Sequence, residues 1–147
     1  MIEAYEAGTA APLELYALGL AHKHVLEIMR YTGLTRRPLF VPAVGNFRQG
    51  MLVELPLHLD MLPGKPTAAH LQQALAAHYA GSPWVTVEAA GESGKLDATA
   101  LADTNQMELR VFGNEEHRHA LLIARLDNLG KGASGAAVQN LQLMLGL

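Results

Sequence analysis

Two histidines separated by a lysine, His22-Lys23-His24, are the side chains of this sequence best suited to acid–base chemistry. Histidine gains and loses a proton near neutral pH, so either imidazole could act as a general acid or base. Two imidazoles at this spacing could also chelate a metal from a strand, but no third ligand lies nearby in the sequence. The plain alternative is two solvated histidines ahead of a helix. His117-Arg118-His119 repeats the spacing beside Glu115 and Glu116, where we favour solvated side chains.

A glycine-rich segment, Gly130-Lys131-Gly132-Ala133-Ser134-Gly135, follows an expected strand and opens an expected helix. This G-x-G-x-x-G pattern is typical of a turn that binds a dinucleotide with its phosphates at the helix N-terminus. Only residues 136–147 follow, which leaves no place for a second strand or for the acidic residue, about 20 positions on, that holds the ribose. We therefore favour a glycine-rich helix start that packs closely on another element. A nucleotide site shared with another piece of chain stays open.

A polar turn between two glycines, Gly45-Asn46-Phe47-Arg48-Gln49-Gly50, lies between two strand-like runs. The guanidinium of Arg48 and the amides of Asn46 and Gln49 could bind a carboxylate or a phosphate. The other interpretation is an ordinary polar hairpin tip. The sequence favours neither interpretation over the other.

The elements that must position these residues are short. A helix is expected over His24–Tyr31, ended by Gly33, and another over Thr67–Tyr79 with Thr67 as its N-cap. In Met51–Leu59 every odd-numbered residue is apolar, which predicts a strand with one buried face. Four further strands are expected, at Leu39–Val44, Trp84–Val87, Met107–Phe112 and Ala120–Leu126. The last two are expected to be joined through Gly113-Asn114, and a final helix is expected in Gly130–Leu147. Residues 1–20 and 88–100 are expected to be irregular.

These elements predict an α+β fold with a mostly antiparallel sheet that helices cover on one face. We expect residues 1–147 to form a single domain, because 147 residues leave no room for two well-packed ones. The apolar face of the Met51–Leu59 strand leads to a hypothesis of a homodimer that packs sheet against sheet.

Composition excludes several classes of protein. The chain has no cysteine, which removes disulfides, cysteine-ligated metals and a thiol nucleophile of its own. A formal net charge of −3 argues against nucleic-acid binding. We expect no membrane span and no signal peptide, and hence a cytoplasmic protein. Only 17% of the residues are charged while 50% are hydrophobic, which indicates a surface partly covered by other protein.

Leu126–Asn140, which contains the glycine-rich segment, resembles the signature of N-acetyl-γ-glutamyl-phosphate reductases. Three further segments resemble motifs of that family in the same order. They are Tyr16–Ile28 with the two histidines, Phe40–Leu52 with the polar turn, and Thr104-Asn105. The resemblance covers nearly the whole chain but only the back half of the family's enzymes. In those enzymes a nucleotide-binding domain and a cysteine nucleophile precede this region.

The resemblance implies the C-terminal catalytic and dimerisation domain of an oxidoreductase, similar in fold to that of glyceraldehyde-3-phosphate dehydrogenase. The reaction would be the NADPH-dependent reduction of N-acetylglutamyl phosphate to the semialdehyde, a step of arginine biosynthesis. NADP would be bound mainly by the absent domain, against which residues 130–147 would pack, and the chain alone would be inactive. A homodimer or homotetramer is expected.

The resemblance also implies roles for individual residues. His22 or His24 would be the acid–base residue, and we place His22 first. Asn46, with Arg48 and Gln49, would face the substrate's carboxylate or phosphate, although the arginine is displaced by one position from the family pattern. Asn128, Gly132 and Gln139 would lie near the nicotinamide end of the cofactor. No metal site is expected. The alternative is a non-catalytic structural or oligomerisation module derived from this fold.

Overall fold

The computed structural model describes residues 2–91 and 94–147. Internal contacts divide the chain into two compact units, Met1–Arg48 and Gln49–Leu147. The boundary falls within the polar turn Gly45–Gly50. The interpretation of that turn as a hairpin tip is wrong, because β2 pairs with β1 and β3 with β6, and the two halves of the turn belong to different units.

The first unit contains two short helices and a two-stranded sheet. Helix α1 is Ile2–Glu6, and strands β1 (Leu13–Leu15) and β2 (Ala43–Gly45) pair antiparallel. The prediction that residues 1–20 are irregular was therefore wrong in part, since α1 and β1 are too short to give a periodic pattern. The predicted strand Leu39–Val44 is also largely wrong. Pro42 has no N–H to donate, and only its carbonyl joins the ladder, accepting a bond from the Tyr16 N–H.

Helix α2, His24–Thr32, confirms the predicted helix of the histidine segment. It ends at Gly33, whose φ of 71° is left-handed and whose N–H donates to the carbonyl of Met29. Val25 is fully buried, whereas Leu26 and Tyr31 are exposed. The helix therefore buries one side of its first turn and holds His24 at its first position.

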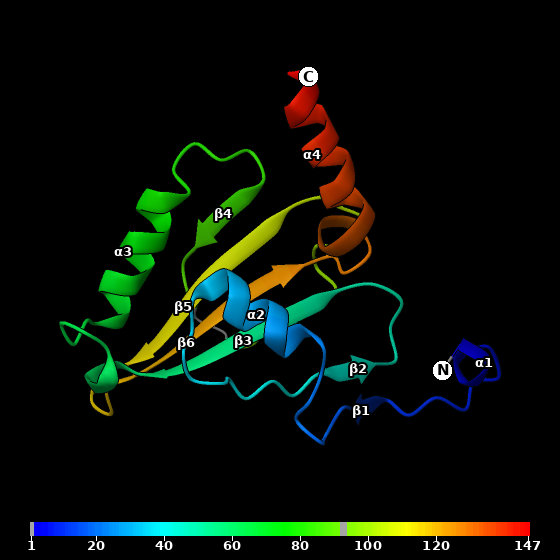
Figure 1. Cartoon of the computed structure of the whole chain (residues 1–147), viewed down its shortest axis with the longest axis horizontal. Helices are drawn as coiled ribbons and strands as arrows, with labels where there is room; N and C mark the ends of the chain where they lie inside the picture. Colours follow the sequence, from blue (N-terminus) through cyan, green and yellow to red (C-terminus); the bar gives the residue numbers. More distant parts are fainter. Residues whose placement is uncertain (1, 92–93) are drawn as a thin grey trace. The chain divides into compact units, whose positions relative to one another are not determined.

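The second unit is built on a four-stranded sheet in the order β3-β6-β5-β4 (Figure 1). Its strands are β3 (Met51–His58), β4 (Val85–Glu88), β5 (Met107–Asn114) and β6 (His119–Leu126). The pairings β3–β6 and β5–β6 are antiparallel, and β4–β5 is parallel. The predicted α+β class is confirmed. β5 and β6 extend beyond the predicted limits, so their turn is residues 115–118 rather than Gly113-Asn114.

Helix α3, Ala68–His78, packs on β5 and β4. Thr67 caps it as predicted, because its hydroxyl accepts from the His70 N–H while the His70 imidazole accepts from the Thr67 N–H. The core of the unit consists of Leu59, Val111 and Ala120, with partly buried residues around it that include Leu71 and Leu75 of the helix. Ala74 and His78 of this helix are exposed.

The apolar face of β3 is less buried than the alternation predicts. Val53 is 50% exposed and Leu55 is 53% exposed, and only Leu59, just after the strand, is fully buried. The physical reason is the strand order. β3 is the edge strand at the opposite side of the sheet from β4, whereas α3 packs on β5 and β4, so α3 does not cover Val53 and Leu55. A pattern of alternation shows which side chains share a face but not whether an element covers that face.

The C-terminal helix begins as a π-helical turn, Gly130–Ser134, and continues as α4, Gly135–Leu145. Figure 1 shows α4 projecting from one end of the sheet. Its large apolar side chains are exposed, namely Val138, Leu141, Leu143, Met144 and Leu145. No helix in residues 2–91 and 94–147 is long and apolar enough to cross a membrane.

Candidate functional site

The two histidines of the first unit lie against each other in an aromatic cluster. The ring centroids of His22 and His24 are 4.6 Å apart, and the Phe40 ring is 5.3 Å from His22. The ring of Tyr16 is 5.9 Å from His22. The segments that surround the histidine motif thus bring aromatic side chains to both imidazoles.

The hydrogen bonds of the two imidazoles differ. Nδ1 of His22 accepts a 3.2 Å bond from the backbone N–H of His24, so neutral His22 carries its proton on Nε2. Protonation of Nδ1 would break this bond. Nε2 of His24 instead lies 3.8 Å from Oε2 of Glu27, one helical turn further along α2. The His24 ring is therefore held by a side chain of its own helix, whereas Nδ1 of His22 is occupied by a backbone N–H.

The predicted anion-binding turn is divided between the two units. Asn46 and Arg48 are exposed residues of the first unit. Gln49 belongs to the second unit, where its Nε2 donates a 2.7 Å hydrogen bond to Oδ2 of Asp127. The Gln49 amide is therefore engaged within the chain, whereas the guanidinium of Arg48 lies on the surface.

Asp127 is the buried polar centre of the second unit, and sequence reasoning did not single it out. Its side chain is fully buried. Oδ1 accepts from the N–H groups of Leu129 (2.7 Å) and Gly130 (3.0 Å). Oδ2 accepts from the Asp103 N–H at 2.6 Å and from Gln49. These donors, led by Gly130, lower the pKa of Asp127 although burial would raise it. The only sequence signal was an aspartate three positions before the glycine-rich segment.

The glycines of the Gly130–Gly135 segment are required by close packing. A Cβ on Gly130 would lie 2.5 Å from the Thr104 carbonyl oxygen. A Cβ on Gly135 would lie 2.5 Å from Oδ1 of Asn105 and 2.7 Å from the Gly130 carbonyl. The segment therefore packs directly against Thr104-Asn105, which agrees with the packing interpretation.

The backbone of the same segment does not form a phosphate cradle. The N–H groups of Gly130, Gly132 and Ser134 all donate to oxygens of this chain, at Asp127 and Leu129. A pyrophosphate needs such groups free and pointing outward. The residues present thus do not fit the phosphates of a dinucleotide.

The residues expected near the cofactor gather where α4 begins. Oδ1 of Asn128 accepts a 2.9 Å bond from the Gly50 N–H. Oε1 of Gln139 accepts from Nζ of Lys131 at 2.6 Å and from Nδ2 of Asn105 at 3.2 Å. Gly132 is exposed on the π-helical turn beside them. Asn105 Oδ1 is buried and has no hydrogen-bond partner in the structure. The region is an amide-rich surface with a single ammonium group, Lys131, which is already bonded.

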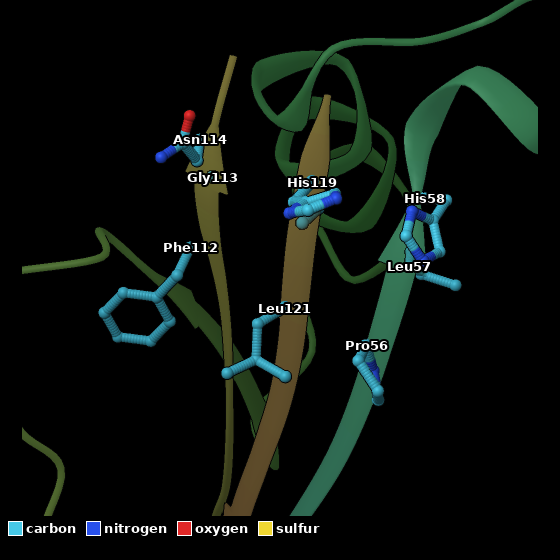
Figure 2. A pocket seen from close by; sticks show the side chains of 9 residues that line it. Pro56, Leu57, His58, Phe112, Gly113, Asn114, His119 and Leu121 are labelled. Carbon is cyan, nitrogen blue, oxygen red and sulfur yellow. The ribbon is translucent and has the colours of Figure 1, made fainter. Parts of the chain in front are cut away.

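A hollow of about 440 Å³ lies elsewhere in the second unit, on one face of the sheet. Figure 2 shows His58 and His119 next to each other at one end of it, with Pro56, Leu121 and Phe112 further along the strands. None of the site residues predicted from sequence lines this hollow. Within the part of the chain that the structure describes, no group of three or more histidine, aspartate or glutamate residues is placed to hold a metal ion.

Comparison with known proteins gives the family. The family model described as "Semialdehyde dehydrogenase, dimerisation domain" matches residues 3–128. The N-acetyl-gamma-glutamyl-phosphate reductase of Burkholderia lata is 51% identical over 99% of this chain and 48% of the relative. The N-acetyl-gamma-glutamyl-phosphate reductase 2 of Pseudomonas putida is 50% identical over 95% of this chain and 46% of the relative. The reductase of Brucella ovis is 53% identical over 90% of this chain and 44% of the relative.

The chain thus spans about half the length of the curated relatives it matches. The match to the family model extends through α2, the polar turn and the sheet, and ends at Asn128, just before the π-helical turn. It therefore includes both histidines and the buried carboxylate of Asp127. The chain belongs to the semialdehyde dehydrogenase dimerisation-domain family.

Proposed function

We propose that this chain is the substrate-binding and self-associating half of an NADP-dependent N-acetyl-γ-glutamyl-phosphate reductase. The reaction converts N-acetylglutamyl phosphate into its semialdehyde in the cytoplasm. The observation that carries the proposal is the geometry of the histidine pair, with His24 beside Glu27 at the start of α2. It is supported by about 50% identity to curated reductases over nearly the whole chain.

The proposed chemistry requires a thiol, and this chain has no cysteine. The thiolate belongs to the other half of the reductase, where it attacks the acyl carbon and expels phosphate. NADPH supplies the hydride that reduces the resulting thioester to the aldehyde. This chain contributes an imidazole that takes the proton from the thiol and stabilises the thiolate by its charge.

We assign that proton to Nδ1 of His24. Nε2 of His24 faces Glu27, which leaves Nδ1 to take up the proton, and the imidazolium then lies beside a carboxylate. His22 keeps Nδ1 occupied by the His24 N–H and is a positioning residue that orients the first turn of α2. The geometry supports placing His24 ahead of His22, the reverse of the order drawn from the sequence.

Arg48 is the proposed anion ligand, with Asn46 beside it in the polar turn. An exposed guanidinium can form two parallel hydrogen bonds to a phosphate or a carboxylate. Gln49 has its Nε2 bonded to Asp127, so we assign it a positioning role for the turn rather than a direct contact.

The surface where α4 begins is proposed to face the nicotinamide end of NADP. Asn128, Gly132 and Gln139 would contribute there, while the phosphates are held by the other half of the reductase, because the Gly130–Gly135 backbone is occupied. The exposed apolar side chains of α4 are proposed to pack on that half. The reductase is proposed to be a homodimer or homotetramer, and the family description as a dimerisation domain supports self-association.

A hybrid enzyme tests the proposed function. This chain replaces the matching half of the Burkholderia lata reductase, and the oxidation of NADPH is measured with and without the acyl phosphate. Turnover that requires both substrates is expected from the hybrid, none from this chain alone, and less with NADH than with NADPH. A folded hybrid without turnover, beside an active Burkholderia lata enzyme, would instead favour a non-catalytic oligomerisation module.

A further inference from the structure

Residues 103–105 run alongside the stretch of chain that starts α4, and each of the three touches a different part of that stretch. The contacts, in chain order, are Asp103 with Asp127, Thr104 with Gly130, and Asn105 with Gly135. The first is a 2.6 Å hydrogen bond from the Asp103 N–H to Oδ2 of Asp127. The other two are close packing, since a Cβ on either glycine would lie 2.5 Å from an oxygen of the segment. Of these three contacts, only that of Asp127 is a hydrogen bond.

Asp103 has a backbone conformation that needs such a bond. Its φ is 61°, in the left-handed region, which a residue with a Cβ adopts only at a cost in free energy. The carboxylate that accepts from its N–H is fully buried, and a hydrogen bond to a charged acceptor is stronger than one to a neutral acceptor. Asp127 therefore offsets the strain at Asp103 and fixes the direction in which the chain continues to Asn105.

The amide of Asn105 in turn fixes the amide of Gln139. Nδ2 of Asn105 donates to Oε1 of Gln139 at 3.2 Å, and Nζ of Lys131 donates to the same oxygen at 2.6 Å. Both lone pairs of Oε1 are thus occupied, which leaves Nε2 as the group of Gln139 that can bind a ligand. An amide N–H suits a carbonyl acceptor, so this surface fits the uncharged carboxamide end of a nicotinamide cofactor better than its phosphates.

We propose that Asp127 is a positioning residue for cofactor binding, which acts through Asp103 and Asn105 on Gln139. This role rests on the proposed function and adds to it a residue that the cofactor does not touch. Asp127 is fully buried, and both of its oxygens accept hydrogen bonds from this chain. Without the buried charge, residues 103–105 lose their anchor and the amide of Gln139 is no longer held in one orientation. Binding must then order this amide, which weakens the affinity for the cofactor.

A purely structural role for Asp127 has a different consequence. A less stable enzyme contains fewer folded molecules, so its turnover per total protein falls. The molecules that remain folded still bind the cofactor with the original affinity. The dissociation constant of NADPH, measured on folded protein, therefore separates a positioning role from a structural one.

Titration of the hybrid enzyme with NADPH alone, followed by fluorescence, tests the proposal without depending on turnover. Asp127→Asn should raise the dissociation constant about tenfold, the effect of one lost hydrogen bond. Asn105→Ala should raise it by a similar factor. The double variant should also show an increase of about tenfold rather than about a hundredfold, because both substitutions interrupt the same path.

Two features keep the test decisive where Asp127→Asn fails to fold. Asn105→Ala removes a buried acceptor, Oδ1, that has no partner in the structure, so the folded state loses little by it. In the steady state this variant should raise KM for NADPH while KM for the acyl phosphate stays within about twofold. Val111→Ala is the control for lost stability, since it removes buried methyl groups from the core beneath α3 and should leave the dissociation constant of NADPH unchanged.

A folded Asp127→Asn hybrid that binds NADPH as tightly as the unmodified hybrid would overturn the positioning role. Effects of Asp127→Asn and Asn105→Ala that multiply in the double variant would also overturn it, because Asp127 would then act by another path. Unchanged binding in Asn105→Ala would do so even if Asp127→Asn is unfolded. In each of these cases, turnover by the unmodified hybrid would leave the proposed function standing. A hybrid that neither binds NADPH nor turns over would overturn both.

Discussion

Nε2 of Gln49 donates a 2.7 Å hydrogen bond to Oδ2 of Asp127, across 78 positions of the chain. This bond links the first residue of the second unit to the turn that starts the C-terminal helix. The Asp103 N–H reaches the same oxygen at 2.6 Å, so three separate segments meet at one carboxylate. The segments are those proposed to face substrate and cofactor, and their geometry depends on this buried charge.

Replacing Asp127 with asparagine should destabilise the chain by about 3 kcal/mol, because a buried group that accepts charge-assisted hydrogen bonds becomes an amide that faces N–H donors. Urea unfolding followed by circular dichroism measures the change. Asp60→Asn removes the same charge from an exposed aspartate and should change stability by less than about 0.5 kcal/mol. Equal effects of the two substitutions would contradict the role assigned to Asp127.

The stability of the chain should fall in acid through Asp127 and Glu108. Hydrogen bonds lower the pKa of both carboxyls, and for Glu108 the two arginines outweigh the effect of burial. The unfolded chain therefore takes up protons at these sites first as the pH falls. Their contribution is complete above the ordinary values of 3.8 and 4.5 and is lost below them. In urea titrations from about pH 6 to about pH 3, the stability difference between Asp127→Asn and the unmodified chain should shrink. A constant difference would be inconsistent with a lowered pKa.

Much of the second unit was predictable from local pattern. β3 and α3 were found because the alternation of β3 and the capping threonine of α3 are local signals, and Gly113-Asn114 marked the division between β5 and β6. The two strands of the first unit were not. β1 and β2 have three residues each and are defined by pairing with each other across about 30 positions of chain, which leaves almost no periodicity to detect.

The candidate site was predictable only in its residue types. The histidine pair is local, and sequence placed both residues correctly ahead of or within a helix. The difference between His22 and His24 depends on a backbone N–H and on Glu27, which become neighbours only once α2 forms. Asp127 was missed because its partners Gln49 and Asp103 are 78 and 24 positions away.

Gly135→Ala should destabilise the chain by about 1–3 kcal/mol although alanine favours helix, because the new methyl would lie 2.5 Å from Asn105 Oδ1. The Gly130 carbonyl, at 2.7 Å, is backbone and cannot rotate away. Thermal unfolding of the purified variant measures the effect. Gly19→Ala is the matched control, since nothing lies within 4 Å of a Cβ there, and it should be neutral. A neutral Gly135→Ala would mean that α4 is not held against Thr104-Asn105.

The central claim is that this chain supplies the acid–base residue of a reductase, and the turnover number of the hybrid enzyme tests it most directly. His24→Gln should lower kcat by about 100-fold or more with little change in KM, as expected when a general acid–base residue is lost. His22→Gln should have a smaller effect, and His78→Gln none. An active hybrid in which His24→Gln retains its kcat would contradict the claim.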